Sequence, residues 1–188
     1  LIEVMKHSRK ICRHLHLPLQ SGSSRILAAM NRRYDKEHYL ALVEKLRAAV
    51  PDISLTTDII VGFPGETEEE FAQTLSFLKE IRFYEMHVFK YSRRKGTRAD
   101  RMEQQIPEQI KTRRSEILLK LSEENSLRYR ERLLGKTVEV LMEEACILHG
   151  RTWQIGHTRE YVKVAVPSET PLTNRMVRVN VEQMSENG

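Results

Sequence analysis

The chain has 188 residues, with 31 Lys and Arg against 26 Asp and Glu, which gives a formal charge of +5 and a pI near 9.3. Hydrophobic residues make up 40% of the sequence, and no run reaches the roughly 18 consecutive apolar residues of a membrane span, so the composition indicates a soluble globular protein. The first residues lack the apolar stretch of a secretory signal, and we expect a cytoplasmic protein. The basic excess fits an anionic partner but does not require one.

Cys12 and Cys146 are the only cysteines and lie far apart in the sequence. This separation argues against a disulfide framework and excludes a metal site made of cysteines alone. The sequence begins without methionine, inside an amphipathic segment. We therefore expect it to be a piece of a longer protein.

The first hundred residues alternate between strand and helix patterns. Strands are predicted over 11–19, 53–63 and 86–91, each with β-branched or alternating apolar residues next to turn signals. Helices are predicted over 24–30, over 35–49 with Asp35 as N-cap, and after a capping box formed by Thr67 and Glu70. This order predicts an α/β fold with parallel strands, and three such strands make only an open part of a barrel.

The rest of the chain changes character at Pro107. A charged helical pattern runs from there to about residue 134, with Gly135 as a plausible stop. Apolar and polar residues then alternate over 136–142, 161–166 and 176–181, which predicts a small all-β domain. We expect a half-barrel over 1–106, a connector helix over 107–135 and a β-domain over 136–188.

Candidate ligand-binding loops follow the three predicted strands, at 20–23, 62–66 and 91–95. Ligands of parallel α/β folds lie beyond the carboxyl ends of the strands, where glycines allow close approach of the backbone. Ordinary turn chemistry explains each loop separately. The convergence of three loops at one edge of the sheet favours a binding site.

Four stretches carry a resemblance to a known family, and they are LPLQSGS at 17–23, MNRRY at 30–34, TDIIVGFPGET at 57–67 and YSRRKGT at 91–97. In order and spacing they resemble the methylthiotransferase family of radical S-adenosylmethionine enzymes, and residues 136–183 look like the TRAM domain that follows the barrel there. The resemblance implies a partial TIM-type radical SAM barrel followed by a small all-β TRAM barrel. Residues 88–92 and 156–164 look most like the branch that modifies N6-threonylcarbamoyladenosine beside the tRNA anticodon. Sister branches act on isopentenyladenosine in tRNA or on a ribosomal protein.

The family resemblance also implies cofactors. One [4Fe–4S] cluster cleaves S-adenosylmethionine to a radical, and a second [4Fe–4S] cluster supplies sulfur for insertion at C2 of the adenosine. The cysteines that hold both clusters are absent from this sequence. We expect the chain on its own to show neither a cluster nor turnover.

Position within the motifs implies the binding residues. Contacts to S-adenosylmethionine are expected from Gln20, Ser21, Gly22, Ser23, Asp58, Ile60, Gly62, Phe63, Pro64, Gly65 and Tyr91. Contacts to tRNA are expected from basic residues after the third predicted strand, namely Arg93, Arg94, Lys95 and Arg98. They are also expected from an aromatic and basic set in the β-domain, namely Trp153, His157, Arg159, Tyr161 and Lys163. A structural role remains open for each residue, and Asp58 either faces a ligand or bonds to neighbouring strands.

Two further patterns remain ambiguous. His14 and His16 flank Leu15 and share one face of a strand. A histidine in the core or on a polar strand face explains them better than a metal does, and we assign no metal. Arg32 and Arg33 fit a substrate carboxylate or phosphate, or plain surface charge. A non-catalytic RNA-binding module is the main alternative function, and no nucleophile–base pair or P-loop supports an unrelated α/β enzyme.

Overall fold

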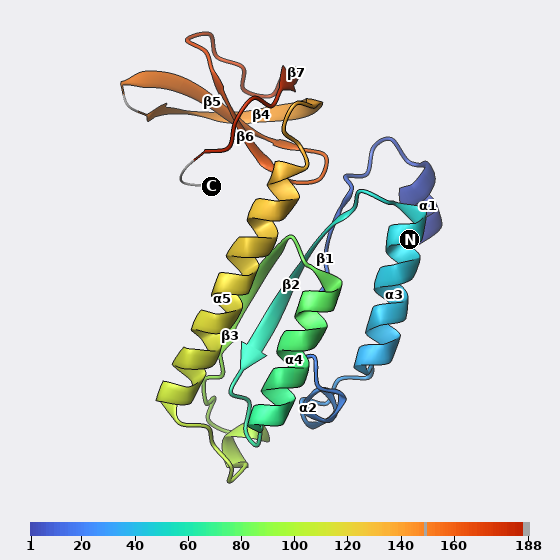
Figure 1. Ribbon diagram of the computed structural model, residues 1–188, viewed down its shortest axis with the longest axis vertical. Coiled ribbons are helices and arrows are strands. Elements are labelled where there is room, and N and C mark those ends of the chain that lie inside the picture. Colours follow the sequence, from blue (N-terminus) through green and yellow to red (C-terminus); the bar gives the residue numbers. More distant parts are fainter. Residues whose placement is uncertain (149, 186–188) are drawn as a thin grey trace. The chain divides into compact units, whose positions relative to one another are not determined.

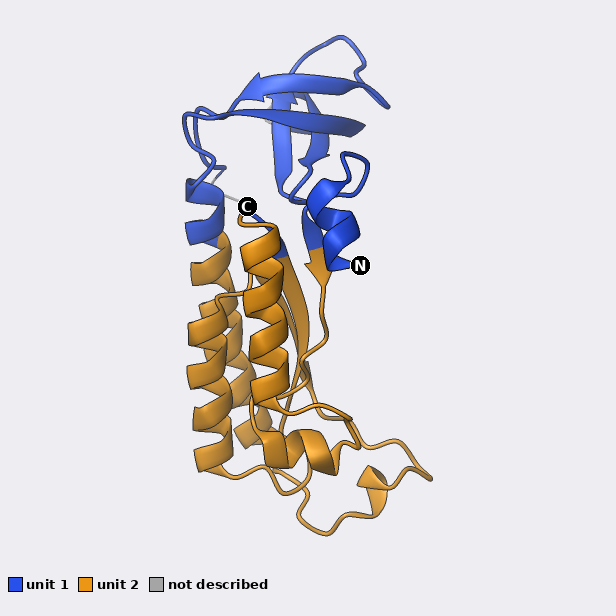
Figure 2. Cartoon of the chain, turned by 90° about the vertical axis from the view of Figure 1, so that its right-hand side faces the viewer, with its two compact units in different colours: residues 1–14, 52–54, 127–188 blue, residues 15–51, 55–126 orange. Residues whose placement is uncertain are grey.

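The computed structural model describes residues 1–148 and 150–185, which form two compact units (Figures 1 and 2). Unit 2 consists of residues 15–51 and 55–126. Unit 1 consists of residues 1–14, 52–54 and the chain from 127 onward. This division differs from the predicted boundaries, because the first residues of the chain group with its C-terminal β-rich part.

The sheet of unit 2 has the strand order β1-β2-β3 in the described residues. Its strands are β1 at His14–His16, β2 at Ser54–Val61 and β3 at Glu85–Lys90. β2 and β3 pair in parallel, as the order of elements predicted. This pairing places Asp58 opposite His87. β1 is shorter than predicted at both ends. At its carboxyl end Pro18 has no N–H to donate, and a parallel bridge between Gln20 and Ile59 resumes the pairing.

Helices cover one face of this sheet (Figures 1 and 2). They are α2 at Ser24–Ala29, α3 at Lys36–Ala49, α4 at Glu68–Ile81 and the first part of α5, which spans Glu108–Glu131; a short 3₁₀ turn lies at Ala99–Arg101. The predicted caps are present, since Asp35 accepts from the His38 N–H and Thr67 with Glu70 forms a capping box. These caps fix where α3 and α4 begin.

The buried face of α5 contains cations as well as apolar side chains. Ile117 is 38% exposed, whereas Lys111 and Arg114 are buried together with Leu118 and Leu121. The positions still follow the three- and four-residue spacing of one helix face. Periodicity of apolar residues missed this face because buried cations occupy its first two turns.

Unit 1 contains an antiparallel sheet of order β6-β5-β4-β7 in the described residues. Its elements are α1 at Ile2–His7, β4 at Thr137–Leu148, β5 at Arg151–Thr158, β6 at Lys163–Pro167 and β7 at Met176–Asn180. The sheet curls at a β-bulge between Met142 and Glu144, where β4 pairs with β5. β5 lies outside the strands predicted from the sequence. The antiparallel sheet does not by itself establish the expected TRAM barrel.

The first residues of the chain bind to the turn between β5 and β6. The Arg13 N–H donates to the Arg159 carbonyl at 2.7 Å, and Arg159 Nη2 donates to the Arg9 carbonyl at 2.7 Å. Ser54 Oγ donates to the Glu160 carbonyl. These bonds explain why residues 1–14 and 52–54 belong to unit 1. None of the helices in the described chain has the length and apolarity needed to cross a bilayer.

Candidate functional site

The sheet of unit 2 has an open face opposite its helices. Side chains on a strand alternate, so Leu55, Ile59 and Val61 are buried on the helical side while Asp58 and Ile60 face the other way and are only partly buried. Phe89, opposite Ile60 on β3, is 52% exposed. The open face therefore presents polar groups at its middle and apolar groups nearer the carboxyl ends of the strands.

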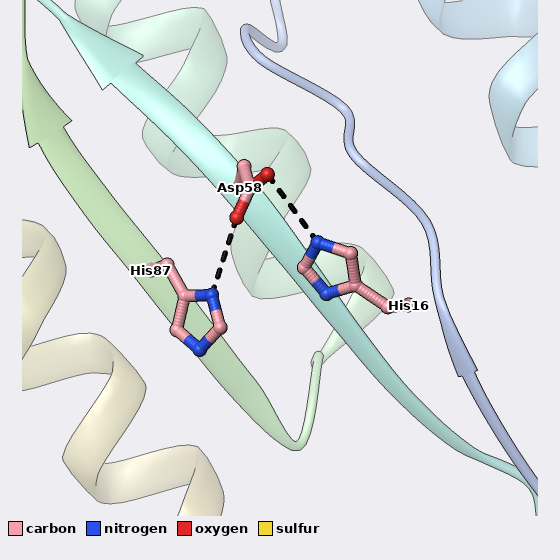
Figure 3. Close-up of side chains that lie close together, drawn as sticks. All are labelled: His16, Asp58 and His87. Carbon is pink, nitrogen blue, oxygen red and sulfur yellow. Dashed lines mark hydrogen bonds and ion pairs between the residues drawn. The ribbon is translucent and has the colours of Figure 1, made fainter.

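Asp58 lies between two histidines on this open face (Figure 3). Asp58 Oδ2 is 3.3 Å from His16 Nε2, and Asp58 Oδ1 is 3.2 Å from His87 Nδ1. Thr56 Oγ1 lies 2.9 Å from His16 Nδ1 and fixes the orientation of that ring. We call His16, Asp58 and His87 the His–Asp–His cluster. Both readings of Asp58 stay open, because it bonds to the neighbouring strands and faces the open side.

The loop after β1 is buried against α4. Ser21 Oγ lies 3.3 Å from Thr74 Oγ1, which also accepts from the Gly22 N–H at 3.1 Å. Ser23 caps α2 and donates to Glu70. The Arg25 guanidinium, hydrogen-bonded to the same carboxylate, holds the pKa of Glu70 below its usual value. The hydroxyls of this loop thus already have protein partners, and their predicted contacts to cofactor stay a prediction.

Gln20 occupies the left-handed region, with φ of 73°. Its N–H donates to the Asp58 carbonyl and its carbonyl accepts from the Ile60 N–H, both across to β2. The residue is 7% exposed. Its backbone therefore extends the sheet to the edge where the predicted loops begin.

The loop after β2 turns around a buried carboxylate. Gly62, with φ of +71°, donates its N–H to Glu66 Oε2 at 2.7 Å. Arg114 Nη1 pairs with the same oxygen at 2.6 Å, and both side chains are at most 2% exposed. Burial raises the pKa of Glu66, whereas the Gly62 N–H and Arg114 oppose that rise. This ion pair fixes the loop that carries Phe63, Pro64 and Gly65.

Tyr91 closes the carboxyl end of β3. Its ring meets Phe63 edge to face at a centroid distance of 5.4 Å, and its backbone carbonyl accepts from Lys111 Nζ at 3.0 Å. The Tyr91 hydroxyl is buried and has no hydrogen-bond partner among the described residues. Burial also raises the pKa of this hydroxyl. A polar atom of a ligand would satisfy it.

These observations test the fit of the implied cofactors. The unpartnered Tyr91 hydroxyl, the partly buried Ile60 and the exposed Phe89 fit one side of a nucleoside-containing molecule such as S-adenosylmethionine. An iron–sulfur cluster does not fit, because Cys12 and Cys146 are the only thiols and such clusters need several close thiolates. No step is assigned to a cluster on this chain.

The basic loop after β3 is partly neutralised. Arg93 pairs with Asp100 at 3.0 Å, and Lys90 pairs with Glu108 at 2.6 Å. Arg94, Lys95 and Arg98 are exposed, and none of them has an acidic partner in the described part of the chain. These three are the residues of the loop that remain available to phosphate.

The predicted RNA-binding set of the β-domain falls into separate groups. Tyr161 stacks with His157 at 4.5 Å and with His14 at 5.0 Å, so its ring is already engaged with protein rings. Arg159 binds backbone carbonyls of the first residues, as described above. Trp153 is half-buried on β5 below Arg151, and Lys163 is exposed at the start of β6.

Sequence reasoning missed three residues that shape these sites. His87 was passed over, although a parallel register between the second and third strands would have placed it beside Asp58. Glu66 and Arg114 were missed because their pairing joins residues 48 positions apart. No pattern among neighbouring residues predicts such a pair.

Comparison with known proteins identifies the superfamily to which the fold belongs. Residues 1–78 match the model of the radical SAM superfamily. A solved structure, coproporphyrinogen III oxidase (HemN) from Escherichia coli, described as a radical SAM enzyme, superposes with a TM-score of 0.51 at 18% identity. The match covers 79% of this chain and 41% of that one. The half-barrel of unit 2 thus has the radical SAM fold.

Proteins of similar sequence identify a family within this superfamily. The chain is 45% identical over 181 residues to tRNA-2-methylthio-N(6)-dimethylallyladenosine synthase of Acetivibrio thermocellus, covering 96% of the chain and 38% of the relative. It is 41% identical to threonylcarbamoyladenosine tRNA methylthiotransferase MtaB of Bacillus subtilis, covering 96% of the chain and 40% of the relative. The resemblance to the radical SAM methylthiotransferases is confirmed, and the chain spans about two fifths of the length of these relatives.

Proposed function

We propose that this chain forms part of an enzyme that methylthiolates C2 of an N6-modified adenosine in tRNA. The observation that carries the proposal is the similarity along 96% of the chain to proteins named as tRNA methylthiotransferases. In such an enzyme, S-adenosylmethionine supplies the radical and the methyl group. We expect such an enzyme to work in the cytoplasm.

Within that reaction, the residues of unit 2 would bind S-adenosylmethionine and orient it. Ile60 and Phe89 offer an apolar surface, and the Tyr91 hydroxyl offers a buried donor to a polar edge. The Glu66–Arg114 pair holds the loop between Phe63 and Gly65 in place. The remaining expected contacts, those of Gln20, Ser21, Gly22 and Ser23, would come from a loop already held against α4.

The N6 substituent is the finer part of the proposal. The stretches at 88–92 and 156–164 favour threonylcarbamoyladenosine beside the anticodon, whereas the relatives of higher identity carry dimethylallyladenosine in their names. Mass spectrometry of tRNA nucleosides from cells without the gene tests both. Loss of the 2-methylthio derivative of threonylcarbamoyladenosine supports the first substrate, and loss of the dimethylallyl derivative supports the second. Loss of neither contradicts tRNA methylthiolation.

The tRNA contact is testable on the chain itself. Replacing Arg94, Lys95 and Arg98 together by Gln should weaken binding of tRNA and lower the slope of log affinity against log salt by up to about 3, because each phosphate contact contributes about 1. A matched variant, with exposed Lys6, Lys45 and Lys79 changed to Gln, removes the same charge elsewhere. Equal losses in both variants would show that only net charge matters.

A further inference from the structure

We propose that the His–Asp–His cluster binds a divalent transition-metal ion such as Zn²⁺. The three side chains come from three neighbouring strands, β1, β2 and β3, and meet on the open face (Figure 3). Imidazole and carboxylate are preferred ligands of these ions, and two histidines with one carboxylate form a recurring three-ligand set. The proposal goes beyond methylthiolation and does not depend on it.

The spacing of the ligand atoms suits an ion. Bonds of about 2.0–2.1 Å in a tetrahedral zinc site place neighbouring ligand atoms roughly 3.3 Å apart. His16 Nε2 and Asp58 Oδ2 are 3.3 Å apart, and His87 Nδ1 and Asp58 Oδ1 are 3.2 Å apart. One ligand atom from each residue lies within 4.8 Å of the other two. Small side-chain rotations therefore suffice to surround an ion.

Thr56 prepares His16 for coordination. A hydroxyl both donates and accepts, so Thr56 Oγ1 can donate to His16 Nδ1 while the Nε2–H donates to Asp58. When an ion binds, the proton sits on Nδ1 and donates to Thr56, which leaves the Nε2 lone pair for the metal. Histidine ligands in metal sites commonly have such a partner on the second ring nitrogen.

Access to the cluster also favours an ion. The side chains of His16, Asp58 and His87 are 37%, 27% and 57% exposed, so an ion can enter and keep a water molecule. Three protein ligands with one open position are typical of zinc sites that act on a substrate. The carboxylate supplies the negative charge that offsets part of the charge of the ion.

The other histidine–carboxylate pairs within residues 1–148 and 150–185 lack a third ligand. His38 and Asp35 are 2.9 Å apart on the surface of α3, and His157 and Glu143 are 2.8 Å apart in unit 1. Among the described residues, the His–Asp–His cluster is the group of three found to converge. The His38–Asp35 pair therefore provides a matched control.

The test uses the metal-free 188-residue chain titrated with Co²⁺ and then with Zn²⁺. We expect one Co²⁺ per chain, with visible bands of a four- or five-coordinate ion that Zn²⁺ abolishes. His87→Ala and Asp58→Asn should each weaken Zn²⁺ binding at least tenfold, and Thr56→Val should weaken it about tenfold without changing the stoichiometry. His38→Ala should bind like the unmodified chain. Circular dichroism checks that each variant is folded.

Several results would overturn the assignment. They are a titration that does not saturate, an affinity that His87→Ala and Asp58→Asn leave unchanged, and an equal loss in His38→Ala. An intense near-ultraviolet band from thiolate to cobalt would place the ion on Cys12 or Cys146 instead. His87 is exposed, so its replacement by Ala removes a ligand without disturbing the core.

Discussion

At the residue scale, the pair of Glu66 and Arg114 bears on stability because both charges are buried. Their side chains are 1% and 2% exposed, and Arg114 also donates to Glu68 on α4. A buried charge that loses its partner costs far more than an exposed one. Arg113, one position earlier on α5, pairs with the same Glu68 from the surface, with 58% of its side chain exposed.

Arg114→Met should lower the free energy of unfolding by about 3–5 kcal/mol, because the Glu66 carboxylate stays buried without a cation. Arg113→Met should change it by less than about 1 kcal/mol. Urea denaturation of both variants measures the difference. Similar values for the two would contradict a special role for the buried pair, and adding Glu66→Gln to Arg114→Met should recover part of the loss.

The loss in Arg114→Met should depend on pH. Arg114 lowers the pKa of Glu66, which burial raises above 4.5, so its removal raises this pKa further. A carboxyl with a higher pKa in the folded chain binds more protons when folded, so stability falls as pH rises from the unfolded value toward the folded one. The variant should therefore be least impaired near pH 4.5 and most impaired at neutral pH. A deficit that does not change with pH would assign the cost to packing.

At the element scale, the loop after β1 depends on the absence of a side chain at position 22. A Cβ there would lie 2.7 Å from the Thr74 Cα and 3.0 Å from the Phe77 Cβ, both on α4. The Gly22 N–H donates to Thr74 Oγ1 across the same contact. The close approach of loop and helix therefore requires glycine.

Gly22→Ala should cost about 1–3 kcal/mol, because a backbone atom of α4 cannot move aside like a flexible side chain. Hydrogen exchange should accelerate in α4 and in the loop. Gly96→Ala is the control: it strains a left-handed residue in an open loop where nothing lies within 4 Å, and it should leave exchange in α4 unchanged. Faster exchange of α4 in both variants would argue against a local contact.

Local signals predicted most elements of unit 2. The capping box at Thr67 and the β-branched run of β2 depend only on neighbouring residues, so sequence reveals them. The buried face of α5 and the position of His87 depend on partners far along the chain, and pattern alone could not supply them. In the candidate site, the loops were foreseen, while the internal hydrogen bonds of Ser21 and Ser23 were not.

At the scale of the whole molecule, the two cysteines of this sequence are too few to hold the [4Fe–4S] cluster that the radical SAM family implies. Incubated without oxygen with iron and sulfide, the chain should show no broad visible absorbance of a [4Fe–4S] cluster, because it has only two cysteines. Iron analysis and electron paramagnetic resonance after reduction measure this. A reduced cluster signal that disappears in a Cys12→Ser, Cys146→Ser variant would contradict the prediction.

The composition of unit 1 has a consequence for the order in which the protein takes shape on the ribosome. Residues 15–126 contain everything that unit 2 needs, so it can fold once they have emerged. Unit 1 needs Arg9 and Arg13 from the beginning of the chain and Arg159 from near its end. Residues 1–14 therefore remain without the strands that they bind until more than a hundred further residues have been synthesised. A ribosome stalled once residue 126 has left its exit tunnel should expose residues 1–14 to protease while unit 2 is already protected.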